Sequence, residues 1–146
     1  MALDFVIMDG DTVIFKPNCG AATVVVRPGK IKASGLSTIN GKKFCVEGDE
    51  KSVTVAGCLY TKLSHLKPGS GTLKIKKLAD DQLTTRIFSG KDRIILKGSS
   101  FESVFEVNTP AEDIKPVAAG GAPPDQSGPY RGEGQIIPGT SKIKAL

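Results

Sequence analysis

Alternation of apolar and polar residues is clearest over residues 72–78, where Leu73 and Ile75 alternate with Lys74 and Lys76. Successive side chains of a β-strand point to opposite faces, so this period of two predicts a strand with one buried and one solvated face. Shorter apolar and β-branched runs recur at residues 21–27, 52–55, 84–88 and 93–97. The pattern therefore predicts many short strands.

Turn signals separate these runs. An Asn-Gly or Asp-Gly pair between two such runs favours a tight hairpin, because it tolerates the positive φ angles of the turn. Three hairpins are predicted: residues 3–15 around Asp9-Gly10-Asp11, residues 36–46 around Asn40-Gly41, and residues 84–97 around Ser89-Gly90-Lys91-Asp92. We expect Pro68-Gly69-Ser70-Gly71 to end the preceding segment, residues 78–83 to make one helical turn, and residues 101–107 to close the ordered core.

Composition supports an all-β fold. The 146 residues include 17 glycines, 9 prolines and no tryptophan, which favours short strands joined by turns. A compositional boundary near Asn108-Thr109-Pro110 predicts a β domain over residues 1–109 and an extended Pro/Gly-rich tail over residues 110–146. Several apolar residues of the tail can dock on a partner or back on the core: Tyr130, Ile136, Ile137, Ile143 and Leu146.

The charge pattern and the apolar runs bear on the partners and on the place of synthesis. The net charge is +5, but the lysines are scattered along the chain and no aromatic residues interleave with them. We expect solvated strand faces and no nucleic-acid partner. No apolar run approaches the roughly 18 to 20 residues of a membrane span, and the N-terminus carries no signal-peptide pattern. We therefore expect cytoplasmic synthesis.

The residues typical of enzymes are sparse. His65 is the only histidine, and the sequence contains no Gly-x-Ser-x-Gly elbow, P-loop or His-Glu-x-x-His motif. The carboxylates of Asp9, Asp11, Glu47 and Asp49 stand in predicted turns, where turn chemistry explains them better than acid/base catalysis. The sequence therefore predicts a protein that is not an enzyme.

One set of residues suggests a metal. Cys19, Cys45, Cys58 and His65 are four soft or borderline ligands, and three cysteines with one histidine form a known tetrahedral zinc set. Their spacing lacks the paired Cys-x-x-Cys form. The alternative is three small buried apolar side chains and a surface histidine.

Four blocks of this sequence resemble the PAAR-like spike-tip proteins of contractile injection systems and phage tails. They lie between Met8 and Val107 and read MDGDTVIFKPNCGAATVVV, SGLSTINGKKFCVEGDE, KPGSGTLKIKKL and DRIILKGSSFESVFEV. The literal Pro-Ala-Ala-Arg motif is absent, and Pro17-Asn18-Cys19-Gly20-Ala21-Ala22 is the nearest segment.

The resemblance implies a small cone of short strands. Its base sits on a trimeric β-helical spike, one copy per spike, and its apex leads into the target envelope with transient membrane contact. Tips of this type bind a metal, usually zinc, near the apex. Here Cys19, Cys45, Cys58 and His65 would hold zinc, with iron as second choice.

The predicted tail has more than one possible role: it can bind the spike or carry a cargo or effector. Such a tip also needs local pseudo-threefold character, although no threefold repeat is recognised in the sequence. A stand-alone β binding module or secreted effector that contacts an anionic surface is the alternative function. The completed particle would place the tip outside the producing cell or in the target envelope.

Overall fold

The computed structural model describes residues 4–36, 38–39, 41–139 and 144–145. Short strands dominate: β1 (Asp4–Phe5), β2 (Thr12–Phe15), β3 (Asn18–Cys19), β4 (Ala22–Val24), β5 (Gly29–Lys30), β6 (Thr38–Ile39), β7 (Lys42–Lys43), β8 (Thr54–Lys62), β9 (His65–Lys77), β10 (Leu83–Ser89), β11 (Asp92–Ile95), β12 (Phe101–Thr109), β13 (Tyr130–Ile137) and β14 (Lys144–Ala145). Three single turns of 3₁₀ helix occur among the described residues: η1 (Asp49–Ser52), η2 (Asp80–Gln82) and η3 (Val117–Ala119). The predicted all-β class is confirmed.

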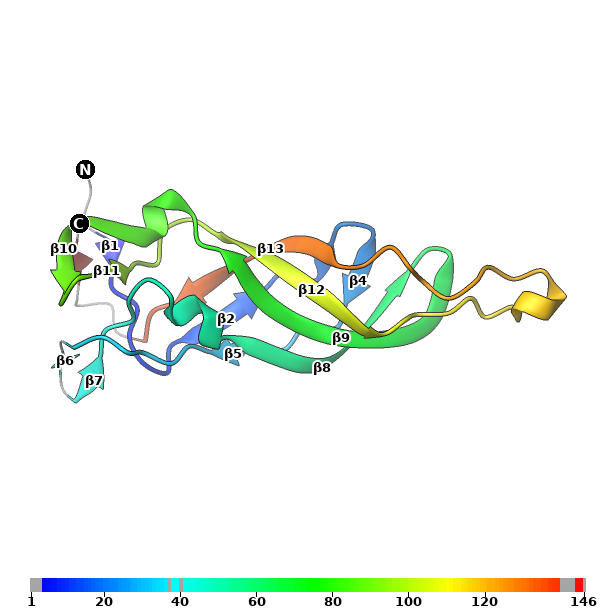
Figure 1. Ribbon diagram of the computed structural model, residues 1–146, viewed down its shortest axis with the longest axis horizontal. Coiled ribbons are helices and arrows are strands. Elements are labelled where there is room, and N and C mark those ends of the chain that lie inside the picture. The colour runs from blue at the N-terminus through cyan, green and yellow to red at the C-terminus, as the bar shows by residue number, and fades with distance from the viewer. Residues whose placement is uncertain (1–3, 37, 40, 140–143, 146) are drawn as a thin grey trace.

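The molecule is elongated, with a broad end and a narrow end (Figure 1). An eight-stranded antiparallel sheet in the order β3-β4-β8-β9-β12-β13-β2-β5 forms the body. Two-stranded sheets β1-β14, β6-β7 and β10-β11 lie at the broad end. The segment between β12 and β13 reaches out to the narrow end, where it carries η3.

The large sheet curls until its two edges approach other strands. A Cβ on Gly29 of edge strand β5 would lie 3.0 Å from Val55 of β8. A Cβ on Gly132 of β13 would lie 3.0 Å from the sulfur of Cys19 in the opposite edge strand β3. Curling encloses an apolar core, in which Phe15 meets Phe101 edge to face with the ring centroids 5.5 Å apart. A narrow body thereby buries its apolar faces without a second layer.

Several strand predictions are confirmed. The hairpins around residues 40–41 and 89–92 form as β6-β7 and β10-β11, although Asn40 itself lies outside the described residues. The alternating run lies in β9 with Leu73 and Ile75 buried, and residues 80–82 form the predicted helical turn.

Three predictions are wrong. Residues 4–15 do not form a hairpin, because β1 pairs with β14 while β2 pairs with β13 and β5. The Pro68–Gly71 segment continues β9 instead of ending a strand; proline is tolerated there as an exposed residue before the main β9-β12 pairing begins. The core does not close at residue 107, because β13 inserts between β12 and β2.

The chain beyond residue 110 is therefore partly in the fold. Tyr130 and Ile136 are buried in the core, which selects docking on the core from the two possibilities for these residues. Ile143 and Leu146 lie outside the described residues. The division into residues 1–109 and 110–146 as separate units stays a prediction.

Candidate functional site

The four predicted metal ligands do not meet as one group. Cys19 lies in β3, Cys45 follows β7, Cys58 lies in β8, and His65 begins β9. Among the residues that the structure describes, no three histidine, cysteine, aspartate or glutamate side chains lie together as a metal would require. All three cysteines are buried in the apolar core cluster. Zinc or iron binding stays a prediction, and the donor set offers no ready site for it.

Burial also opposes metal binding by two of the thiols, those of Cys19 and Cys45. It raises the pKa of Cys19 and of Cys45, and the carboxylate of Asp49 adds to the effect on Cys45. Metal binding requires a thiolate, so a raised thiol pKa opposes it. Cys45 has a different structural role in the broad end.

Three segments of eight residues follow one pattern at this end: residues 4–11 (DFVIMDGD), 42–49 (KKFCVEGD) and 92–99 (DRIILKGS). Each has three apolar residues, a charged residue and a glycine at the same offsets. The glycines are Gly10, Gly48 and Gly98, with φ angles of 81°, 105° and 54°. Because residues that carry a side chain rarely adopt positive φ angles, glycine is favoured at this position of the pattern.

Backbone hydrogen bonds close the three segments into a cycle. The amide of Ile7 donates to the carbonyl of Ile95 at 2.9 Å, that of Ile95 to Cys45 at 2.9 Å, and that of Cys45 to Ile7 at 3.0 Å. A second cycle joins the residues two positions away and passes through the three segments in the opposite order. The amide of Asp9 donates to the carbonyl of Lys43 at 2.9 Å, that of Glu47 to Arg93 at 2.8 Å, and that of Lys97 to Phe5 at 2.9 Å. We call residues 4–11, 42–49 and 92–99 the threefold ring.

Side-chain burial follows the same symmetry. The central residues Ile7, Cys45 and Ile95 are all 0% exposed and join the main core. Their neighbours Val6, Met8, Ile94 and Leu96 form a second buried cluster with Phe44 packed against it. Cys45 thus occupies the position that isoleucine fills in the other two segments, which explains its burial without a metal.

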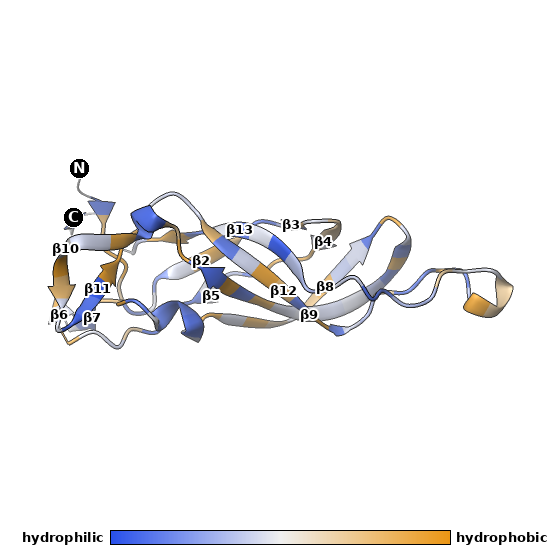
Figure 2. Ribbon diagram, turned by 45° about the horizontal axis from the view of Figure 1, so that its top comes forward, coloured by the Kyte–Doolittle hydropathy of each residue, from blue (hydrophilic) through white to orange (hydrophobic). Residues whose placement is uncertain are grey.

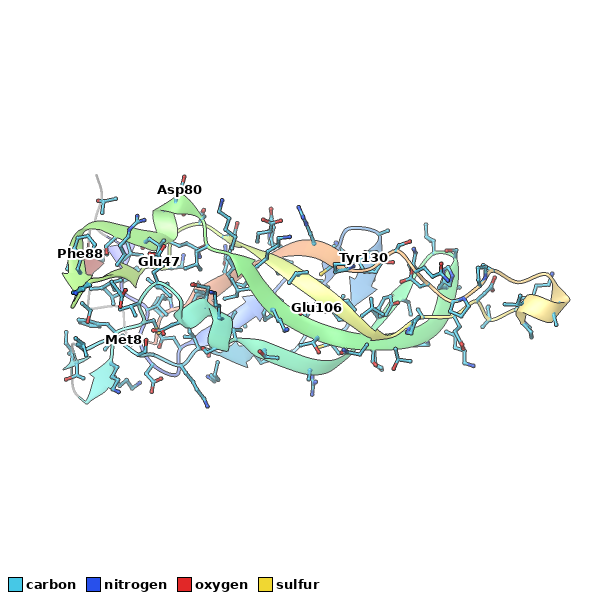
Figure 3. All side chains as sticks on the ribbon, viewed as in Figure 1. Met8, Glu47, Asp80, Phe88, Glu106 and Tyr130 are labelled. Carbon is cyan, nitrogen blue, oxygen red and sulfur yellow. The ribbon has the colours of Figure 1, made fainter. Side chains whose placement is uncertain are left out.

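The end of the segment carries the same side-chain hydrogen bond in two of the three repeats. The amide of Met8 donates to Asp11 Oδ2 and that of Val46 to Asp49 Oδ2, each at 2.8 Å. In the third segment Ser99 stands where the other two have aspartate. The amide of Leu96, which corresponds to those of Met8 and Val46, donates instead to the carbonyl of Gln82 at 2.8 Å. Glu47 and Met8 are marked in this end of the molecule in Figure 3. The acidic residues that the sequence assigned to turns therefore have a structural role.

An outer strand flanks each inner segment. β14 pairs with β1, β6 with β7, and β10 with β11. Beside these strands lie the exposed apolar residues Leu36, Ile39, Ile87 and Phe88, which are 82%, 36%, 43% and 50% exposed. We call these four the apolar face; the apolar end of β10 is visible in Figure 2, and Phe88 stands at the extremity in Figure 3.

At the opposite end, a buried polar cluster holds the narrow loop on the body. The hydroxyls of Tyr60 and Tyr130 both donate to Asp125 Oδ2 at 2.7 Å, and Lys62 Nζ lies 3.3 Å from Asp125 Oδ1. Tyr60 also accepts a hydrogen bond from the amide of Ala111 at 2.9 Å. Both ends of the narrow loop, residues 110–129, are thus tied to β8 and β13; Tyr130 is labelled in Figure 3.

Electrostatics show that the cluster is built around an ionised carboxylate. Burial by itself would raise the pKa of Asp125, but hydrogen bonds from Tyr60, Ser127 and Tyr130, together with Lys62, outweigh it and lower the pKa below its ordinary value. Burial, with the nearby carboxylate, raises the pKa of Tyr60 to about 12. The tyrosines therefore remain hydrogen-bond donors at neutral pH.

His65 is part of this attachment. Its Nε2–H donates to the carbonyl of Pro123 at 2.7 Å, and its Nδ1 lies 2.7 Å from Ser64 Oγ. The residue predicted to be a metal ligand therefore binds the returning arm of the narrow loop. Exposed apolar residues also gather at this end: Leu63, Leu66, Ile114 and Val117.

An open groove of about 910 Å³ lies on the body between Asn18, Leu78 and Phe101. Its charged side chains are of mixed sign, and two pairs compensate each other, Lys16 with Glu133 at 3.2 Å and Arg131 with Glu102 at 3.7 Å. The groove therefore presents no concentrated charge for a ligand. None of the helices in the described residues is long and apolar enough to cross a membrane.

The threefold ring is the feature that sequence reasoning missed. In the sequence, each repeat reads as three apolar residues, a charged residue and a glycine, followed by Asp11, Asp49 or Ser99. The repeats share isoleucine only at the middle apolar position of two of them, Ile7 and Ile95, and are separated by segments of unequal length. Their common hydrogen bonding is therefore what makes them evident.

Comparison with known proteins agrees with this architecture. A search of curated proteins finds no match. A family model described as contractile injection system spike tip protein matches residues 1–146. The chain therefore belongs to the family of contractile injection system spike tip proteins.

Proposed function

We propose that this chain caps the trimeric central spike of a contractile injection system, with its broad end against the spike. The threefold ring is the observation that carries the proposal. A homotrimer presents three identical surfaces around its axis, and one chain can contact all three in the same way only if its own contact surface is repeated three times. The two hydrogen-bond cycles supply that repetition at one end of the molecule.

The apolar face supports the same orientation. Large apolar side chains grouped at one end of a small protein mark an interaction surface. A Cβ on Gly90 would lie 2.9 Å from Leu36 Cδ1, so Leu36 lies against the β10-β11 turn and the face is continuous with the outer strands. Capping would cover this face and the outer strand edges, which otherwise invite aggregation.

The narrow end then leads the particle into the target envelope. Its loop is held by the Asp125 cluster, so that a thin extension with little core of its own is fixed on the sheet. The proposed function is structural, without catalysis, at the tip of a phage tail-like particle and with one copy per spike. Attachment of a cargo through residues 110–146 stays a separate prediction.

The test is binding to the purified homotrimeric spike of the same injection system. We expect light scattering after size-exclusion chromatography to give one chain per spike trimer. Phe88→Asp places a charge in the apolar face and should weaken binding at least tenfold. Val117→Asp, a matched change of an exposed apolar residue at the narrow end, should leave binding unchanged.

Two results would overturn the orientation. Three copies bound per trimer would show that the ring does not sit on the threefold axis. A loss of binding with Val117→Asp but not with Phe88→Asp would place the spike at the narrow end. Circular dichroism of both variants establishes that the fold is retained.

A further inference from the structure

The three repeats of the broad end differ in how their outer strands are supplied. In two repeats the outer strand comes directly before its inner strand, as β6 before β7 and β10 before β11. In the remaining repeat, β1 receives its outer strand from β14, at the far end of the sequence. β1, β10 and β11 are labelled at the broad end in Figure 1.

The register shows that β14 is a true equivalent of β6 and β10. Ile39 pairs with Lys42 in the sheet β6-β7, and Ser89 pairs with Asp92 across Gly90-Lys91. In the same positions of the pattern, Ala145 pairs with Asp4.

The preceding pairs correspond in the same way. Thr38 pairs with Lys43, Phe88 with Arg93, and Lys144 with Phe5. Lys144 also places its ammonium 4.7 Å from the centre of the Phe5 ring, a cation–π contact that fixes β14 on β1. The third repeat therefore has the same strand pair as the others, but no short turn joins its strands.

We propose that β14 forms the third side of the surface that receives the spike, so that one spike subunit is contacted by a strand pair built from two distant segments of this chain. This inference rests on the proposed function. The proposed partner is a homotrimer, because the hydrogen-bond cycles join the three inner segments and each of these segments pairs with one outer strand in the same register. Without β14, two spike subunits would meet a strand pair and the third would meet β1 alone.

Deleting residues 140–146 from the full chain tests this role. We expect the variant to retain the large sheet, which does not include β14, and to bind the purified spike trimer at least tenfold more weakly. Circular dichroism and thermal melting report the fold, and biolayer interferometry reports the dissociation constant. Binding within threefold of the full chain would overturn the inference.

A circular permutant supplies the matched control. Ala145 is joined to Asp4 through Asn-Gly, as Ile39 is joined to Lys42, and the chain is opened between the exposed residues Ala119 and Gly120 of the narrow loop. It should bind the spike as tightly as the full chain, because β14 is then held by a hairpin turn. Should the deletion unfold the chain, the permutant is compared with the same permutant carrying Lys144→Pro, which opposes strand pairing.

The two proposals fail differently. If the unaltered chain does not bind the spike, the proposed function is wrong. If the unaltered chain binds and the deletion or the Lys144→Pro permutant binds equally well, only the role of β14 is wrong.

Discussion

Replacing Asp125 with asparagine removes one negative charge from the narrow end while keeping the side chain's size. The Asp125 side chain is 1% exposed, and its oxygens accept hydrogen bonds from Tyr60, Tyr130, Lys62 and the amide of Ser127. Removing one partner of a buried charge pair costs about 3–5 kcal/mol. The remaining amide oxygen of asparagine still accepts a tyrosine hydroxyl, and one such bond contributes about 1 kcal/mol. We therefore expect Asp125→Asn to lower the free energy of unfolding by about 2–4 kcal/mol at neutral pH.

The stability lost in Asp125→Asn should decrease as the pH is lowered. The pKa of Asp125 in the folded protein lies below the ordinary value of 3.8. Its ionised form therefore contributes stability that is fully present above the unfolded-state pKa and is lost as pH falls through the folded-state pKa. Asp125→Asn should cost most near neutral pH and progressively less in acid below about pH 4.

Urea unfolding followed by circular dichroism, at neutral pH and in acid, measures both effects. Glu112→Gln is the control, because Glu112 is at the same end but its ion pair with Lys67, at 3.3 Å, is half exposed. That variant should change stability by less than about 1 kcal/mol. An Asp125→Asn protein as stable as the unaltered chain at neutral pH, or equally destabilised at both pH values, would refute the reasoning.

Three further variants, with Leu63→Ala as a control, test the core, the ring and the sheet. Ile95→Ala, at a fully buried ring position, should lower the free energy of unfolding by about 2–5 kcal/mol in urea, whereas Leu63→Ala, 97% exposed, should leave it nearly unchanged. Cys45→Val should keep the melting temperature within a few degrees, since Cys45 fills an isoleucine-like position; elemental analysis that finds about one zinc per chain, lost in this variant, would instead establish the predicted metal site. Gly71→Ala should destabilise the sheet by about 1–3 kcal/mol or more, because its Cβ would lie 2.3 Å from the Glu106 carbonyl oxygen, and an unchanged urea midpoint would contradict that packing.

Local signals in the sequence predicted what depends on neighbouring residues. The period of two over residues 72–78 correctly places Leu73 and Ile75 inside, because side-chain direction alternates along any strand. The strand pairs β6-β7 and β10-β11 also form, because Gly41 and Gly90 favour a tight reversal between the strands. The resemblance in the four quoted blocks identified the spike-tip family, which the family model confirms over residues 1–146.

Composition was a poor guide to the C-terminal segment. Its prolines and glycines favoured an extended tail, yet Tyr130 and Ile136 are buried and β13 occupies the middle of the sheet. Glycine helps here rather than hinders, because Gly134 allows β13 to pass close to the ring of Phe101. Such a benefit depends on a strand that is distant in sequence.

The candidate site also has a part that the sequence predicted and a part that only the structure shows. The sequence by itself determined an all-β chain of short strands, two of its hairpins, and its family. Only the tertiary structure decided that Cys45 is the counterpart of Ile7 and Ile95, that His65 holds the narrow loop, and that β14 completes the third repeat. The physical reason is that hydrogen-bond cycles and strand pairs join residues far apart along the chain, where neither periodicity nor the spacing of rare residues reports which segments meet.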